Sequence, residues 1–173
     1  MIRAIVFDIG GVLISEGNRE IERDLRKKFN LEENKFRKIK FKYLNKSLTR
    51  KKRDFWFEKK ISKKLKIDFD KFIYYWQKLK KKNFKINKEI FKIIKKLDKK
   101  GYLVWSLTDV NHSHDLIRED LEIYSFFKLN LKSIDLKNRK PHKKIYKILL
   151  KKIRLEPKKI IFIDDMEINL ELN

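Results

Sequence analysis

AIVFDIGGVL, residues 4–13, is the stretch that decides the fold of this chain. Residues 4–7 are apolar and rich in strand-forming types, and the run stops at Asp8, with Gly10 and Gly11 just beyond it. A short continuous apolar run bounded by glycines is typical of a strand buried on both faces. Open α/β sheets bind their ligands at the carboxyl ends of the strands, where Asp8 would lie. The stretch therefore predicts a buried strand with a carboxylate at a ligand-binding edge, although a single Asp in this place can also be a plain turn residue.

The composition predicts a folded chain with one core. Its 173 residues are 42% hydrophobic, which suffices for one core with a subsidiary lobe. There is no cysteine, so disulfide frameworks and thiolate metal sites are excluded. No apolar run reaches the roughly 18 residues of a membrane span, and the N-terminal run is too short for a signal peptide. We therefore expect no membrane association and a cytoplasmic location, while the oligomeric state stays open.

The charge is unusual, because 47 Lys and Arg residues against 24 Asp and Glu residues give a net charge of +23. A nucleic-acid partner is one explanation, since Lys and Arg release counterions from phosphate backbones. The alternative is compositional drift, because Lys, Ile, Asn, Phe and Tyr are all abundant and Gly and Pro are scarce. The basic residues are scattered over nearly every expected helix rather than gathered on one face, so we favour drift over nucleic-acid binding.

The rest of the chain alternates between strands and helices. Short apolar runs at 102–106, 129–134 and 159–163 predict strands, and periodic segments around 87–100, 113–124 and 141–150 predict helices. This alternation predicts an α/β fold with a parallel sheet and right-handed crossovers. Residues 14–17 are expected to form a loop. Residues 18–82 show helical periodicity throughout, so we expect them to form a separate lobe.

Polar side chains follow several of the expected strands. Asp8, Ser106 and the pair Asp164 and Asp165 would all lie at the same edge of a parallel sheet, and Lys140 would approach from a loop. Several carboxylates can hold Mg²⁺ through their oxygens. One carboxylate can attack phosphorus, and a hydroxyl and an ammonium can hold phosphoryl oxygens. The set therefore fits phosphoryl transfer better than any single member would.

At this point the chain resembles the haloacid dehalogenase-like (HAD) hydrolases, in particular the phosphatase-like members. The resemblance is carried by VFDIGGVL (6–13), LVWSLTDVNHSH (103–114), RKPHKKIY (139–146) and IIFIDDMEIN (160–169). It implies a three-layer, Rossmann-like core at 1–15 and 86–173 and a helical cap at 16–85. It also implies that the last helix and strand of the family core are missing after residue 173.

The resemblance also implies a role for each site residue. Asp8 would be the nucleophile and a Mg²⁺ ligand, together with the backbone carbonyl of Gly10. Ser106 would hydrogen-bond the phosphoryl group, and Lys140 would steady the nucleophile and the transferred charge. Asp164 would bind Mg²⁺ directly, and Asp165 would act directly or through water. Dehalogenases of the family also use an Asp nucleophile, but the set of Lys140 and the acidic pair favours phosphate over halide.

Two positions depart from the family pattern. Many family phosphatases place a second Asp, the general acid for the leaving group, where this chain has Gly10. General acid catalysis typically contributes about 10²–10⁴-fold, so its absence would slow the enzyme, restrict it to good leaving groups, or shift the role to water or a residue of the cap. In the second motif the chain reads Ser106-Leu107-Thr108-Asp109; Thr108 could replace Ser106 as the phosphate-binding hydroxyl, and Asp109 adds negative charge there.

Three functions are consistent with these residues. The first is a Mg²⁺-dependent phosphatase of a small phosphomonoester, such as a sugar phosphate, acting through an aspartyl phosphate on Asp8. The second is a catalytically impaired relative that binds a phosphorylated ligand, and the third is a basic nucleic-acid-binding protein. His112 and His114 form an H-x-H pair, for which we expect a place at a helix start or in solvent rather than in a metal site.

Overall fold

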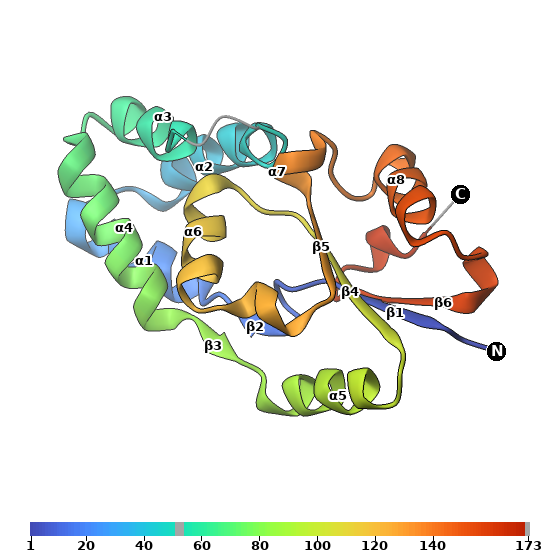
Figure 1. Ribbon diagram of the computed structural model, residues 1–173. Coiled ribbons are helices and arrows are strands. Elements are labelled where there is room, and N and C mark those ends of the chain that lie inside the picture. Colours follow the sequence, from blue (N-terminus) through green and yellow to red (C-terminus); the bar gives the residue numbers. More distant parts are fainter. Residues whose placement is uncertain (51–53, 172–173) are drawn as a thin grey trace.

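The computed structural model describes residues 1–50 and 54–171. Its core is a four-stranded sheet in the order β5-β4-β1-β6, in which every neighbouring pair is parallel (Figure 1). The strands are β1 (Ala4–Phe7), β4 (Leu103–Thr108), β5 (Leu129–Lys132) and β6 (Ile160–Ile163). The opening apolar run therefore supplies an inner strand of the sheet.

Helices cover both faces of this sheet. Ile5 and Phe7 point to the face covered by α5 (Lys88–Lys99). Ala4 and Val6 point to the opposite face, which is covered by α8 (Lys143–Ile153). Successive residues of β1 thus enter two different apolar clusters, as the two-residue period of a strand requires, and all four are buried. The predicted three-layer, Rossmann-like parallel sheet is confirmed.

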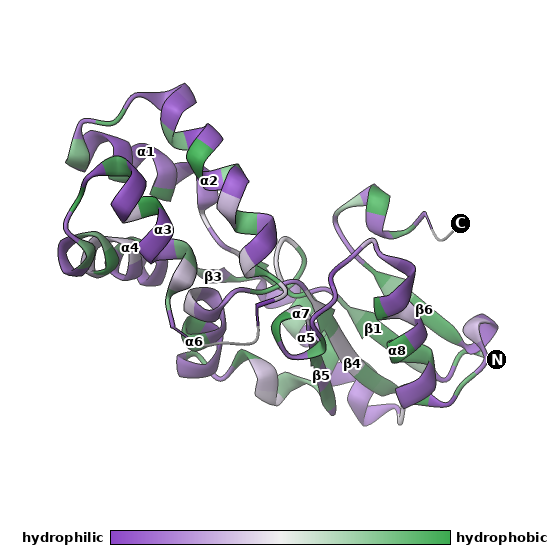
Figure 2. Ribbon diagram, turned by 90° about the horizontal axis from the view of Figure 1, so that it is seen from above, coloured by the Kyte–Doolittle hydropathy of each residue, from purple (hydrophilic) through white to green (hydrophobic). Residues whose placement is uncertain are grey.

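Four helices form a lobe beside the sheet (Figures 1 and 2). They are α1 (Asn18–Phe29), α2 (Glu33–Ser47), α3 (Trp56–Leu65) and α4 (Phe69–Asn83). The lobe has an apolar cluster of its own, built around the buried residues Ile21, Leu25, Phe36, Phe57, Ile61, Phe72 and Trp76. The assignment of residues 16–85 as a substrate-selecting cap stays a prediction.

The chain passes from the sheet to the lobe and back again through two short segments that pair with each other. β2 (Ile14–Ser15) and β3 (Lys85–Ile86) pair as antiparallel strands where the chain leaves for the lobe and returns from it. The loop expected at 14–17 is therefore wrong for residues 14–15. A strand of two residues is too short to show an alternating pattern in the sequence. It forms because residues 14–15 pair with residues 85–86.

The remaining elements connect the sheet to its helices. They are α6 (His112–Asp120), the 3-10 turn η1 (Ile123–Phe126), α7 (Ser133–Leu136) and the 3-10 turns η2 (Pro157–Lys159) and η3 (Glu167–Asn169). β4 runs two residues further than its expected end at Ser106, whereas β5 ends at Lys132 and passes into α7. His112 opens α6 as expected of a helix-start residue. The extension of β4 changes which hydroxyl lies at the ligand-binding edge.

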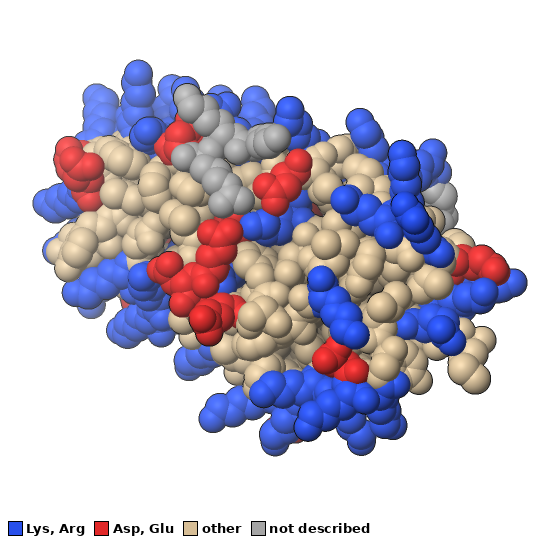
Figure 3. Space-filling model, in the orientation of Figure 1, with Lys and Arg blue, Asp and Glu red and all other residues tan. Residues whose placement is uncertain are grey.

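Basic side chains are distributed over both parts of the molecule. On the face shown in Figure 3, Lys and Arg lie around the whole outline, while a group of acidic side chains crosses the middle. This distribution agrees with the scattering of Lys and Arg along the sequence. Among the described residues, none of the helices combines the length and the apolar character that a membrane crossing needs.

Candidate active site

The carboxyl ends of two neighbouring strands bring three carboxylates together. β1 and β6 pair with Phe7 beside Ile163, so Asp8 and Asp164 follow at the same level. Asp8, Asp164 and Asp165 each offer an oxygen, and these oxygens lie within 4.8 Å of one another. Asp8 and the side chain of Asp164 are buried, whereas Asp165 is exposed. The structure thus unites three of the predicted metal ligands.

Gly11 makes room for the exposed member of this group. Its φ of 82° lies in the left-handed region, and a Cβ built there would overlap the carboxylate of Asp165. A side chain at position 11 would therefore be strained and would displace Asp165 as well.

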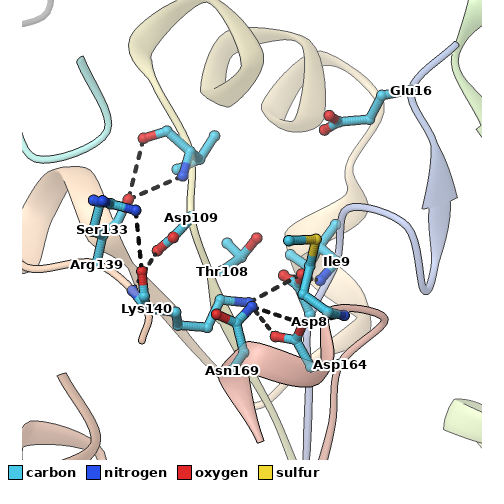
Figure 4. A network of polar contacts seen from close by, with 12 residues as sticks. Asp8, Ile9, Glu16, Thr108, Asp109, Ser133, Arg139, Lys140, Asp164 and Asn169 are labelled. Atoms are coloured by element: carbon cyan, nitrogen blue, oxygen red, sulfur yellow. Dashed lines mark hydrogen bonds and ion pairs between the residues drawn. The ribbon is translucent and has the colours of Figure 1, made fainter. Parts of the chain in front are cut away.

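The ammonium of Lys140 lies between the carboxylates of Asp8 and Asp164 (Figure 4). This ammonium is 3.0 Å from Oδ2 of Asp8 and 2.5 Å from Oδ2 of Asp164, and the residue is only 2% exposed. It comes from the loop before α8, as expected. Asp164 is held further by the backbone N–H of Met166 and the side-chain amide of Asn169, which both donate to Oδ1. Lys140 and Asp164 are therefore fixed from several directions.

The charges of this cluster are not balanced by the protein. Burial raises the pKa of Asp8, Lys140 opposes this rise, and Asp164 adds to it. Lys140 contacts two of the three carboxylates, and Arg118, which also lowers the pKa of Asp8, is itself paired with Glu16, so an excess of negative charge remains. A hard divalent cation with oxygen ligands would remove that excess, so the donor set fits Mg²⁺.

The structure separates the two hydroxyls of the second motif. Ser106 lies within β4 beside Phe7, one residue before the level of Asp8. It is fully buried, and its hydroxyl donates to the side-chain oxygen of Asn130. Thr108 is the last residue of β4 and lies at the edge itself. β4 continues past Ser106, so Ser106 does not lie at the end of the strand as expected and Thr108 does. Thr108 is buried as well, and neither hydroxyl belongs to a residue that lines the cavity between the sheet and the lobe.

Asp109 follows Thr108 and lines the same cavity. Its Oδ1 accepts a hydrogen bond of 3.1 Å from the backbone N–H of Lys140. Burial raises the pKa of Asp109 to about 6, and Lys140 limits the rise. The extra carboxyl expected near the phosphate-binding edge is thus present, and it spends part of the time in the neutral form near pH 6.

A second charged group lies beside Gly10. Arg118, from α6, donates through Nη1 to Oγ1 of Thr108 at 2.9 Å and through Nη2 to Oε1 of Glu16 at 2.5 Å. Arg118 is 1% exposed, and the side chain of Glu16 is 11% exposed. Nδ1 of His114 is 4.0 Å from Oε2 of Glu16. We call Glu16, His114 and Arg118 the Glu16 group.

Charge within the Glu16 group is fixed. Burial alone would raise the pKa of Glu16, but the neighbouring His114, Arg118 and Lys80 lower it to about 2. Burial lowers the pKa of His114 to about 3, so the His114 ring is neutral at neutral pH. Arg118 then carries the positive charge that contacts Glu16. Burial alone would lower the pKa of Arg118, but Glu16 raises it above its usual value. At neutral pH the group is therefore an ion pair between Glu16 and Arg118.

One cavity of about 830 Å³ lies between the sheet and the helical lobe, and the Glu16 group lines it. The sheet side contributes Asp8, Asp109, Lys140 and Asp165, whereas Asp164 lies behind Lys140 and is not among the lining residues. The lobe contributes apolar and basic side chains, namely Lys40, Phe41, Leu44, Leu48, Phe57 and Trp76. The cavity has the size of a small-molecule site.

The sequence does not reveal the Glu16 group. Arg118 is one of 47 basic residues and carries no motif that marks it. Glu16 stands in a segment expected to be a loop, and its partner lies 102 positions later in the sequence. His114 lies in the first turn of α6, as expected of a helix-start residue, and its side chain, 12% exposed, lies beside Glu16. The position of Thr108 could have been found from the sequence, because the apolar run of β4 continues until the first charged residue, Asp109.

A family model for haloacid dehalogenase-like hydrolases matches residues 2–170. The chain therefore belongs to the haloacid dehalogenase-like hydrolases, as the order of its motifs indicated. No curated protein is similar enough in sequence to match it.

Solved structures share the fold. A HAD family enzyme from Bacteroides thetaiotaomicron is 22% identical with a TM-score of 0.78, over 97% of this chain and 86% of that one. The same enzyme in complex with magnesium and inorganic phosphate gives a TM-score of 0.73 and 22% identity, over 98% and 87% of the two chains. L-2-haloacid dehalogenase from Xanthobacter autotrophicus, with chloropropionic acid covalently bound, is 14% identical with a TM-score of 0.68, over 98% and 72%.

Proposed function

We propose that this protein is a Mg²⁺-dependent phosphatase that hydrolyses a small phosphomonoester through an aspartyl phosphate on Asp8. The observation that carries the proposal is the juxtaposition of Asp8, Lys140 and Asp164 at the ends of β1 and β6, with the ammonium 3.0 Å from the Asp8 carboxylate. For a chain without cysteine and with this chemistry we also propose a cytoplasmic location.

The carboxylate cluster supplies the reacting atom. An oxygen of Asp8 attacks phosphorus, the bond from phosphorus to the leaving oxygen breaks, and its electron pair stays on that oxygen. Water then attacks phosphorus, the bond to Asp8 breaks, and phosphate and the free carboxylate are restored. Lys140 keeps Asp8 oriented and places a positive charge beside the phosphoryl oxygens, while the Thr108 hydroxyl donates to one of them.

Asp8, Asp164 and Asp165, with the backbone carbonyl of Gly10, would hold the Mg²⁺ ion. When bound, the ion supplies positive charge that screens the anionic nucleophile from the anionic phosphoryl group. The fit rests on the close approach of the three carboxylates and on their uncompensated charge.

The residues of the carboxylate cluster, rather than the fold, favour phosphate over halide. The Bacteroides enzyme was crystallised with magnesium and inorganic phosphate, and the Xanthobacter enzyme holds a chloropropionic acid adduct, so the fold serves both chemistries. The breaking of a carbon–halogen bond involves no phosphoryl dianion, so it needs no divalent cation to neutralise one. Two neighbouring carboxylates at the end of β6, Asp164 and Asp165, have a clear use in the phosphatase reaction.

The test is the release of phosphate from p-nitrophenyl phosphate. We expect turnover that requires Mg²⁺, disappears with a chelator and is abolished in Asp8→Asn, which keeps the size of the side chain but removes its charge. Failure of the well-folded protein to release phosphate, with equal ligand binding by Asp8→Asn, would favour a protein that only binds phosphorylated ligands. Binding to generic RNA that falls steeply with salt would favour a nucleic-acid-binding protein.

A further inference from the structure

The lobe presents a mainly apolar surface to the cavity. Five apolar side chains from α2, its C-terminal cap, α3 and α4 line it, and we call them the apolar wall: Phe41, Leu44, Leu48, Phe57 and Trp76. Asp8 and Lys140 line the same cavity from the sheet. A phosphoryl group at Asp8 would fill only a small part of about 830 Å³. The rest of a substrate would therefore lie in the space beside the lobe.

Exposed apolar side chains gather around this cavity. Phe41 is 62% exposed, and Met166 and Ile168, which follow β6, are 54% and 53% exposed. All three line the cavity. Single exposed apolar side chains are common on any protein, but several of them around one cavity mark a binding place for an apolar group. Both sides of the cavity therefore offer apolar surface that a ligand could cover.

The polar groups of α2 and α4 that reach the cavity already have partners in the protein. Nζ of Lys40 is 3.2 Å from Oε2 of Glu22, and Nε1 of Trp76 donates to Oγ of Ser113 at 3.1 Å. The other polar lining residues of the lobe, 18–20, are exposed and lie in the first turn of α1. A sugar hydroxyl that leaves water needs a hydrogen-bond partner. Among the described residues, the side chains of the apolar wall offer none that is unengaged.

We infer that the apolar wall receives an aromatic group of the substrate, so that the enzyme selects phosphomonoesters of aryl-substituted alcohols over sugar phosphates. The inference rests on the proposed phosphatase function. The phosphoryl group lies at Asp8 and Lys140, and the aromatic ring leaves water beside Phe41, where two rings can pack edge to face or offset. Phe41 determines specificity, because its ring contacts the substrate and takes no part in breaking the bond to phosphorus.

The test compares phosphomonoesters that all release a primary alcohol, so the chemistry of the leaving group is matched. With Mg²⁺, kcat/KM should be about 10- to 100-fold higher for benzyl phosphate than for glycerol 3-phosphate or glucose 6-phosphate, the range that burial of one aromatic group gives. Phe41→Ala should lower this ratio by about 10-fold. Tyr74→Ala is the matched control, because Tyr74 is 59% exposed on α4 and does not line the cavity, and it should keep the ratio. Equal or lower kcat/KM for benzyl phosphate, or equal ratios in the two folded variants, would overturn the inference.

Binding of phosphonates, which the enzyme does not hydrolyse, separates this inference from the proposed function. With Mg²⁺, calorimetry should show benzylphosphonate binding at least about 10-fold more tightly than methylphosphonate, and Phe41→Ala should remove most of the difference. If the protein hydrolyses no phosphomonoester but keeps this preference, the proposed function fails and the aromatic subsite stands. If it hydrolyses all three esters without preference, only the inference about the apolar wall fails.

Discussion

The two sides of the cavity are built in different ways. On the sheet side, Asp8 and Asp164 follow directly from two paired strands, and Lys140 lies between them. On the side of Gly10, Glu16 directly follows β2 and Arg118 lies in the last turn of α6, 102 positions apart. The backbone of a parallel sheet places the first group, whereas a buried ion pair across two segments places the second.

This difference separates two tasks. In the proposed reaction, the sheet side would carry the groups that form and break the bond to phosphorus, and its residues stand in the stretches through which the chain resembles the family. We expect variants on the sheet side to abolish the reaction and variants on the Gly10 side to change which substrates react.

The largest effect among the remaining variants should follow the loss of Lys140. Lys140→Met removes the ammonium that contacts Asp8 and Asp164, so kcat should fall by about 10²–10³-fold, as when a transition-state donor is removed. The loss also leaves buried carboxylates unpaired, at a cost to the free energy of unfolding of about 3–5 kcal/mol, part of which Mg²⁺ should restore. Thermal unfolding with and without Mg²⁺, beside phosphatase assays, checks both effects.

Lys143→Met is the matched control, because Lys143 begins α8 nearby and is exposed. It should leave activity and stability close to those of the natural protein. Equal activity of Lys140→Met and Lys143→Met would remove Lys140 from the reaction.

A smaller effect should distinguish Thr108 from Ser106. Thr108→Val keeps the shape of the side chain but removes the hydroxyl at the end of β4, and we expect kcat/KM to fall by about 10- to 100-fold, in the range of a single hydrogen bond to a charged group. Ser106→Ala loses only the bond to Asn130 and should cost about 1 kcal/mol of stability with little change in kcat/KM. A larger loss of kcat/KM in Ser106→Ala would return the phosphate-binding role to Ser106.

The smallest effect concerns Asp109 and pH. Its raised folded pKa of about 6 means that the folded chain binds more protons than the unfolded chain between about pH 4 and 6. The free energy of unfolding should therefore fall as pH rises through this window, by about 1–3 kcal/mol from Asp109 alone. Asp109→Asn, which keeps an acceptor for the Lys140 N–H, should lose that part of the dependence. Denaturant unfolding at pH 4 and pH 7 measures it, and identical pH dependence in the two proteins would contradict the burial of Asp109.

Much of the fold could be predicted because its signals are local. The apolar run of β1 and the helical periodicity of residues 18–82 are read from neighbouring residues, and the structure confirms both. β2 and the end of β4 were not predicted, because pairing with a distant segment decides where such strands begin and end. The same limit applied to the site. Asp8 and Asp164 follow strands that the sequence reveals, whereas Arg118 gains its place only through contacts with Glu16 and Thr108.

The most direct test of the account is to trap the intermediate on Asp8. Gly10 leaves the attacking water without a carboxylate base at that position, so the aspartyl phosphate should accumulate during turnover. The enzyme is mixed with Mg²⁺ and radiolabelled acetyl phosphate, quenched with acid and digested. We predict hydroxylamine-labile label, close to one per chain, on the peptide that contains Asp8, and none in Asp8→Asn. Phosphate release without label on the natural protein, or label that persists in Asp8→Asn, would contradict the account.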